Sequence, residues 1–150
     1  MKICVIGTGT MAKGIVKAFA AKMPVVMKSR TQSSLDKAMA SISKGYSKLV
    51  EKEKITQEKM DAILANITTT TDYATFADAD LVIEAAVEDM QLKKGVFTEL
   101  DGICKPETIF ATNSSSLSIT EIAACTKRPA QFIGMHFFNP ADRMALVEVI

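Results

Sequence analysis

A lone histidine and a distant carboxylate could carry acid–base chemistry in the second half of this 150-residue chain. His136 ends the apolar run "QFIGMHFF", where a predicted strand gives way to a loop. Imidazole is the side chain best suited to proton transfer near neutral pH. Glu148 lies in "LVEVI", an unusual place for a carboxylate if both faces of that strand are buried. The alternatives are that His136 is an ordinary core or surface residue and that Glu148 faces water from an edge strand.

A glycine pattern near the N-terminus could hold a phosphate. Gly7, Gly9 and Ala12 form GxGxxA directly after the run "KICVIG" and directly before a helical pattern. The first glycine permits a tight turn, the second lets the backbone approach a pyrophosphate, and the small third residue lets helix and strand pack. Backbone N–H groups near Thr10 and Met11 would face the pyrophosphate, assisted by the helix dipole. Glycines also make ordinary turns, so the flanking strand and helix are what favour dinucleotide binding.

The residues that follow the next apolar run, "VVM" at 25–27, help to determine whether NAD or NADP binds. NAD sites carry an acidic residue about 20 positions after the glycine loop, and Ser29 stands there instead. A carboxylate would repel a 2′-phosphate by on the order of a few kcal/mol, so its absence admits NADP. Ser29 and Thr31 offer hydroxyl donors, and Arg30 offers a planar fork that can grip the phosphate and stack on adenine. We favour NADP, with NAD as the alternative if Arg30 is only a solvated loop residue.

The spacing of apolar residues predicts the elements that position these groups. Short apolar runs predict strands near residues 2–7, 25–27, 66–73, 79–86, 108–113, 131–138 and 146–150. Helical periodicity fills the intervals, with a helix stopped by Pro24, one capped by Ser33 or Ser34, one begun at Thr56, one around 96–103 and one opened by the capping-box pattern "SITE" at 118–121. Strands that alternate with helices imply an α/β fold, a three-layer, doubly wound, mostly parallel sheet of Rossmann type.

Composition and termini narrow the functional class. Eighteen basic and 17 acidic residues give a formal net charge of +1, too little to hold a nucleic-acid backbone by electrostatics. No apolar run approaches the roughly 20 residues of a membrane span, and "MKICVIG" does not read as a signal peptide. Cys4, Cys104 and Cys125 are far apart, which indicates reduced thiols in a cytoplasmic protein rather than a metal site. The chain stops inside "LVEVI", so we expect residues 1–150 to be the N-terminal domain of a longer protein.

Four stretches together resemble the N-terminal domain of the 3-hydroxyacyl-CoA dehydrogenase family, along all 150 residues. They are "GTGTMAKGI", "VIEAAVEDMQLKKGVF", "ATNSSSLSIT" and "IGMHFFNPADRMALVEVI", and the last two are far more specific than the glycine loop. The resemblance implies reversible hydride transfer between NADP or NAD and C3 of a short-chain 3-hydroxyacyl-CoA, as in acetoacetyl-CoA and 3-hydroxybutyryl-CoA. It also implies an all-helical second domain, absent from this chain, that forms a homodimer and completes the substrate site.

The resemblance assigns catalytic roles to three residues. It makes His136 the base that takes the proton of the 3-hydroxyl, and Glu148 the acceptor of a hydrogen bond from His136. It makes Ser115 the hydrogen-bonding partner of the 3-oxygen of the substrate, close to the nicotinamide. Taken alone, the run of three serines around Ser115 indicates only a loop.

The resemblance also assigns binding roles to four residues. Asn139 contacts the side of the nicotinamide ribose, and Glu88 and Lys93 stand against the cofactor, near its ribose or phosphate. Without the resemblance, Glu88 and Lys93 would be interpreted as ordinary residues at a helix N-terminus. Lys52 approaches the phosphates of coenzyme A, although a solvated helix face with neighbouring lysines is the default interpretation there.

Two other functions stay open from the sequence. The chain could belong to a dehydrogenase of another 3-hydroxy acid, such as a sugar acid, or it could bind a dinucleotide without catalysis. The joint presence of His136, Glu148 and Ser115 favours an enzyme, since a binding module needs none of them. Asp142, Arg143 and Ala145 depart from the family pattern beside His136, which leaves the substrate fit open. We expect the 150 residues alone to bind cofactor and to turn over slowly.

Overall fold

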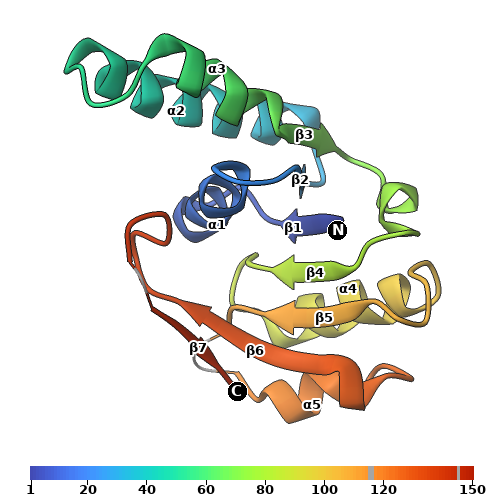
Figure 1. Cartoon of the computed structure of the whole chain (residues 1–150). Helices are drawn as coiled ribbons and strands as arrows, with labels where there is room; N and C mark the ends of the chain where they lie inside the picture. The colour runs from blue at the N-terminus through green and yellow to red at the C-terminus, as the bar shows by residue number, and fades with distance from the viewer. Residues whose placement is uncertain (115–116, 145) are drawn as a thin grey trace.

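A seven-stranded sheet forms the centre of the computed structural model, which describes residues 1–114, 117–144 and 146–150. The strands are β1 (Ile3–Ile6), β2 (Val25–Lys28), β3 (Ile67–Thr70), β4 (Leu81–Glu84), β5 (Ile109–Thr112), β6 (Phe132–Phe137) and β7 (Val147–Val149). Their order is β3-β2-β1-β4-β5-β6-β7 (Figure 1). Every pair is parallel except β6 and β7, which run antiparallel. The predicted doubly wound, mostly parallel sheet is therefore confirmed.

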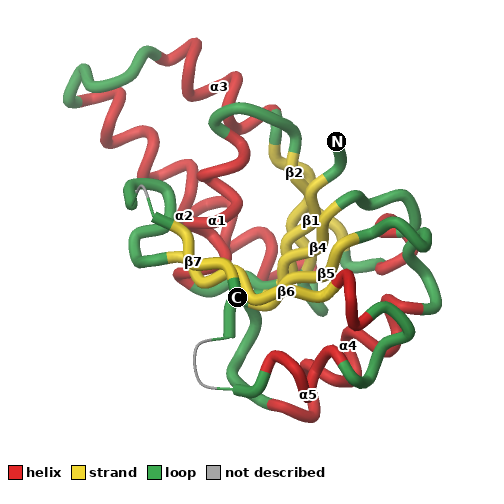
Figure 2. Tube along the Cα trace, turned by 60° about the horizontal axis from the view of Figure 1, so that its bottom comes forward, coloured by secondary structure: helices red, strands yellow, loops and turns green. Residues whose placement is uncertain are grey.

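Helices cover both faces of the sheet and give three layers (Figure 2). They are α1 (Thr10–Ala20), α2 (Gln32–Glu51), α3 (Gln57–Ala65), α4 (Met90–Asp101) and α5 (Ile119–Ala123), with the 3₁₀ turns η1 (Tyr73–Phe76) and η2 (Pro129–Gln131). The helices α1 to α3 pack on one face, and α4 and α5 pack on the other. Within the described ranges, no helix is both long and apolar enough to cross a bilayer.

The residues of the central strand β1 are buried on both faces of the sheet. Ile3 and Val5 point into the core under α1 to α3, whereas Cys4 and Ile6 point into the core under α4 and α5. All four residues are buried, as a central parallel strand requires. The chain moves outward from β1 to β3 and then crosses back to β4 on the other side of β1. Ligand crevices form at the carboxyl ends of strands where the order reverses in this way.

Two of the three predicted helix caps are confirmed, and the third is not. The hydroxyls of Thr56 and Ser118 accept backbone N–H bonds at the starts of α3 and α5, as predicted. The start of α2 is capped by Thr31, whose Oγ1 accepts the N–H of Ser34 at 3.3 Å. The prediction of Ser33 or Ser34 as the cap was wrong. Thr31 already has extended backbone at the end of the loop, so it becomes the first of the three hydroxyl residues able to cap the helix.

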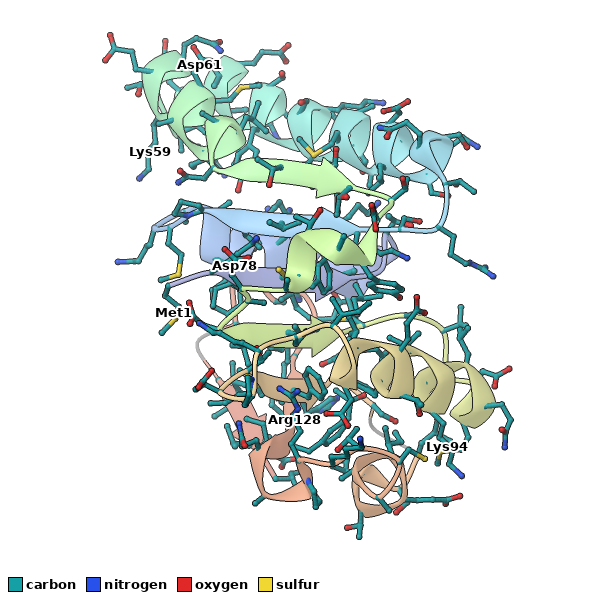
Figure 3. The ribbon with its side chains drawn as sticks, turned by 90° about the vertical axis from the view of Figure 1, so that its right-hand side faces the viewer. Met1, Lys59, Asp61, Asp78, Lys94 and Arg128 are labelled. Carbon is teal, nitrogen blue, oxygen red and sulfur yellow. The ribbon has the colours of Figure 1, made fainter. Side chains whose placement is uncertain are left out.

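Arg128 fixes the segment that leads into β6. Its Nε donates to Asp101 Oδ1 at 2.7 Å, and its Nη1 donates to the carbonyl oxygen of Lys105 at 2.7 Å. The guanidinium carbon lies 4.6 Å from the centre of the Phe110 ring. The side chain is 8% exposed and lies among the packed side chains in the lower half of Figure 3. These contacts join the end of α4 to the entry of β6, the strand that carries His136.

Candidate functional site

The glycine turn lies at the carboxyl end of β1. Gly7 has a φ of 125°, a conformation that L side chains rarely adopt. A Cβ on Gly7 would stand 2.7 Å from the carbonyl oxygen of Ala85 and 3.2 Å from the Cβ of Ala12. The N–H of Gly7 donates to the carbonyl oxygen of Lys28 at 2.9 Å. The turn therefore requires glycine at the first position and a small residue at the third.

Gly9 has no such requirement inside the protein. It is the N-cap of α1 with a φ of −74°, and no side chain caps that helix. A Cβ on Gly9 would meet nothing within 4 Å. The residues from Gly7 to Met11 line a cleft of about 540 Å³. Open space beside a glycine and uncapped N–H groups fits the pyrophosphate of a dinucleotide, which the helix dipole also favours.

The far end of this cleft carries the residues that the sequence linked to cofactor choice. Ser29, Arg30 and Thr31 all line it. Arg30 is exposed, and no salt bridge involves it in the part of the chain that the structure describes. Thr31 also has a structural task, since it caps α2 and its Oγ1 donates to Ser34 Oγ at 2.8 Å.

Sequence reasoning missed two residues at the same end, Lys28 and Tyr73. Both line the cleft, and the Nζ of Lys28 lies 3.6 Å from the centre of the Tyr73 ring. Lys28 is only 4% exposed, and its burial lowers the pKa of its ammonium group, partly offset by the Glu99 carboxylate. The signal was a lysine that directly extends the apolar run "VVM". Its ring partner comes from η1, far along the chain.

A second cavity of about 330 Å³ adjoins the first. Met11, Ala85 and Ala86 line both cavities. The second cavity brings together residues from four separate parts of the sequence, and its polar lining is Glu88, Asn113, His136 and Asn139. Of the residues with predicted roles, His136, Glu88 and Asn139 therefore share one cavity. Ser115 lies outside the described residues.

Asn113 is a further residue that the sequence analysis did not single out. It follows β5, and its Oδ1 accepts the N–H of Phe137 at 2.9 Å. That bond ties the carboxyl ends of β5 and β6 together beside His136. The signal was its place in "ATNSSSLSIT", the stretch from which only Ser115 was chosen.

His136 and Glu148 face each other across the antiparallel pair. His136 on β6 is the register partner of Glu148 on β7. Directly opposite residues in an antiparallel pair point to the same face, with Cβ atoms about 4.5–5.5 Å apart. Phe138 packs edge-on against the imidazole, with ring centroids 5.0 Å apart. The register is compatible with the predicted hydrogen bond, which stays a prediction.

Lys93 lies behind the wall of the second cavity. It is 1% exposed, and its Nζ donates to both carboxylate oxygens of Glu84 at 2.6 Å. The same Nζ lies 3.3 Å from Glu88 Oε1. Lys93 therefore meets a residue of the cavity, while direct contact of Lys93 with a cofactor stays a prediction.

Lys52 lies at the end of α2. It is the exposed C-cap of α2, at the outer end of the α2–α3 pair (Figure 1). It does not belong to the described lining of either cavity. Its predicted contact with coenzyme A is not tested by this geometry.

Comparison with known proteins decides the family. The family model for the "3-hydroxyacyl-CoA dehydrogenase, NAD binding domain" matches residues 2–150. The chain belongs to this family. A protein of Clostridioides difficile named 3-hydroxybutyryl-CoA dehydrogenase is 55% identical over 151 residues, which cover 100% of this chain and 54% of the relative. The fatty acid oxidation complex subunit alpha of Psychrobacter cryohalolentis is 45% identical over 147 residues, which cover 97% of this chain and 20% of that protein.

Solved structures agree with the 3-hydroxyacyl-CoA dehydrogenase assignment. The crystal structure of 3-hydroxybutyryl-CoA dehydrogenase from Escherichia coli K12 matches with a TM-score of 0.95 and 41% identity, covering 99% of this chain and 32% of that chain. The resemblance seen in the sequence and the Rossmann-type fold are both confirmed. The chain corresponds to the NAD binding domain of the 3-hydroxyacyl-CoA dehydrogenase family, and it spans about half the length of the C. difficile relative.

Proposed function

We propose that the two adjoining cavities bind NADP or NAD and that His136 performs the proton transfer of a short-chain 3-hydroxyacyl-CoA dehydrogenase, interconverting acetoacetyl-CoA and 3-hydroxybutyryl-CoA. The observation that carries this proposal is that the two cavities adjoin: the glycine turn lines one, His136 lines the other, and three residues line both. When bound, the nicotinamide accepts or returns the hydride of C3.

The described residues supply the proton chemistry and the orientation. His136 takes the proton of the 3-hydroxyl during oxidation and returns it to the carbonyl oxygen during reduction. Glu148, its partner across the strands, steadies the ring and stabilises the imidazolium. Glu88 and Asn139 line the same cavity as His136, and we propose that they hydrogen-bond the ribose of the cofactor. The proposal keeps Ser115 as the partner of the 3-oxygen.

The proposed function also includes a longer protein, of which this chain forms one part. We propose a helical domain that completes the substrate pocket and forms a homodimer, and a cytoplasmic location. The greater length of the C. difficile relative, of which this chain covers 54%, supports the first. The free state of Cys4, Cys104 and Cys125 supports a reducing compartment.

Turnover by the 150-residue chain alone tests this proposal. We expect it to oxidise NADPH with acetoacetyl-CoA measurably but slowly, because only part of the substrate pocket is present. The rate is followed at the absorbance of the reduced nicotinamide and compared with a relative of full length. Equal turnover numbers would contradict the shared pocket. Activity with free 3-oxo acids and none with the CoA ester would instead favour a dehydrogenase of another 3-hydroxy acid, and binding without any turnover would favour a binding module.

Cofactor choice is a finer part of the proposal, and NADP is the preferred cofactor. The described lining of the first cleft contains two cations, Lys28 and Arg30, and no carboxylate. Ser29 occupies the place where NAD sites carry an acidic residue. A doubly charged 2′-phosphate in this cleft would therefore be attracted by two positive side chains. The family description names NAD, so NAD remains the alternative.

Two substitutions should change this preference in a measurable way. Arg30→Ala should weaken NADPH binding by about ten- to hundred-fold, the value of a charge-assisted hydrogen bond, and should leave NADH binding nearly unchanged. Ser29→Asp should shift the affinity ratio toward NADH by a similar factor. Fluorescence titration with both cofactors measures each ratio. Arg143→Ala is the matched control, because Arg143 is exposed and outside the lining of both cavities. Tighter NADH binding by the unaltered chain would contradict the preference.

A further inference from the structure

A buried carboxylate joins three elements directly behind the cleft. Glu84 is the last residue of β4 and is 0% exposed. Its oxygens accept hydrogen bonds from Lys93 Nζ at 2.6 Å, from Thr112 Oγ1 at 2.7 Å and from the N–H of Ala86 at 2.6 Å. These donors belong to α4, to β5 and to the turn that follows β4. A buried charge is tolerated only when it is paired and hydrogen-bonded in this way.

Stability alone does not account for an ion pair at this place. Apolar side chains of similar volume usually replace a buried ion pair without loss of stability. Apolar residues could fill the place of the Glu84–Lys93 pair, since the core around it is already apolar. Val82 on β4 and Phe97 on α4 are both fully buried there. We therefore expect the role of the Glu84–Lys93 pair to lie in what it contacts, and not in the stability of the core.

The pair contacts the wall of the cavities on two sides. On one side, Glu84 holds the N–H of Ala86, a residue that lines both cavities. On the other side, Lys93 Nζ lies 3.3 Å from Glu88 Oε1. The other oxygen of Glu88, Oε2, accepts a bond from Ser114 Oγ at 2.9 Å. Glu88 is thus held between α4 and the loop after β5, while it lines the cavity of His136.

We propose that Glu84 and Lys93 are positioning residues for the cofactor. Glu84 fixes Lys93, and Lys93 orients the carboxylate of Glu88 toward the second cavity. The single ammonium is shared by two carboxylates, so the orientation of Glu88 depends on Glu84, which touches no ligand. This inference rests on the proposed function, because it assumes that a dinucleotide occupies the two adjoining cavities.

A double-mutant cycle separates positioning from a merely structural role. Lys93→Met should weaken NADPH binding by about ten-fold, and Glu88→Gln should do the same. If Lys93 acts through Glu88, then Lys93→Met adds little in the Glu88→Gln background, less than about three-fold. A structural role predicts that the two losses multiply. Binding is measured by NADPH fluorescence on the whole chain, with folding checked by circular dichroism.

Control variants keep the outcome decisive. Lys94→Met, on the next residue of α4, removes a lysine paired with Glu121 at the surface and should leave binding unchanged. If Lys93→Met does not fold, Glu84→Gln/Lys93→Met replaces it in the cycle, because it leaves no lone buried charge. Multiplicative losses, or NADPH binding by Lys93→Met equal to that of the unaltered chain, would overturn the inference. Failure of the unaltered chain to bind either cofactor would instead refute the proposed function.

Discussion

His136→Gln is expected to lower the turnover number for acetoacetyl-CoA reduction by about 10²- to 10⁴-fold, the usual contribution of a positioned general acid or base. Glutamine has similar size and polarity, and it cannot exchange a proton near neutral pH. Affinity for NADPH should change little, because the substitution keeps the size and polarity of the side chain in the second cavity and the proposed role of His136 is toward the substrate hydroxyl. Initial rates at saturating substrate and a separate fluorescence titration measure the two quantities. A variant that keeps more than about a tenth of the turnover would contradict the role of His136.

Glu148→Gln provides the matched test of the partner residue. Glu148 lies opposite His136 in the β6–β7 register, so its effect should pass through the imidazole. We expect a smaller loss than for His136→Gln, and we expect the double variant to be no slower than His136→Gln alone. A further loss in the double variant would give Glu148 a separate role in the reaction.

The second large effect separates folding from cofactor binding at two neighbouring glycines. Gly7→Ala should lower the free energy of unfolding by about 3 kcal/mol or more, since a non-glycine residue at positive φ alone costs about 1–3 kcal/mol. The added Cβ would also stand 2.7 Å from the carbonyl oxygen of Ala85, a backbone atom with little room to move. Urea unfolding measures the loss.

Gly9→Ala should show the opposite behaviour. Its φ of −74° suits alanine and no protein atom lies within 4 Å of the new Cβ, so stability should be unchanged or slightly higher. Dinucleotide binding should weaken by roughly 10- to 100-fold, because the methyl group takes the space of the pyrophosphate. Unfolding and fluorescence titration are run on both variants. Unchanged NADPH binding by Gly9→Ala would place the pyrophosphate elsewhere.

Local patterns in the sequence were enough to predict the sheet and the glycine turn. Each buried strand is an apolar run, and the turn depends on residues that are neighbours in the chain, such as Gly7 and Ala12. Boundaries were less predictable. The helix α1 ends at Ala20, well before Pro24, and Lys28 belongs to β2 instead of the following loop. A lysine after an apolar run predicts the end of the strand. Lys28 stays in the strand with its ammonium over the ring of Tyr73, a partner that is distant in the sequence.

The buried charges show most clearly what the sequence could not reveal. Glu84 lies inside the apolar run "LVIEAA", and Lys93 lies nine residues later on α4. Each looks like an isolated charge in the sequence, and only the packing of α4 on β4 brings them together. Likewise, His136 and Glu148 lie on two predicted strands, but their pairing needs β7 to run antiparallel to β6, which no local pattern indicated.

The placement of β7 has an evolutionary consequence. Among the described strands it pairs with β6 and no other, so β6 and β7 form one antiparallel pair, joined to the rest of the sheet along β5. The glycine turn and the end of β2 lie on the opposite side of β4. Under the proposed function, the proton-transfer pair His136 and Glu148 and the cofactor-selecting residues Ser29 and Arg30 therefore stand on opposite sides of β4, so inherited substitutions at one pair can accumulate without altering the other.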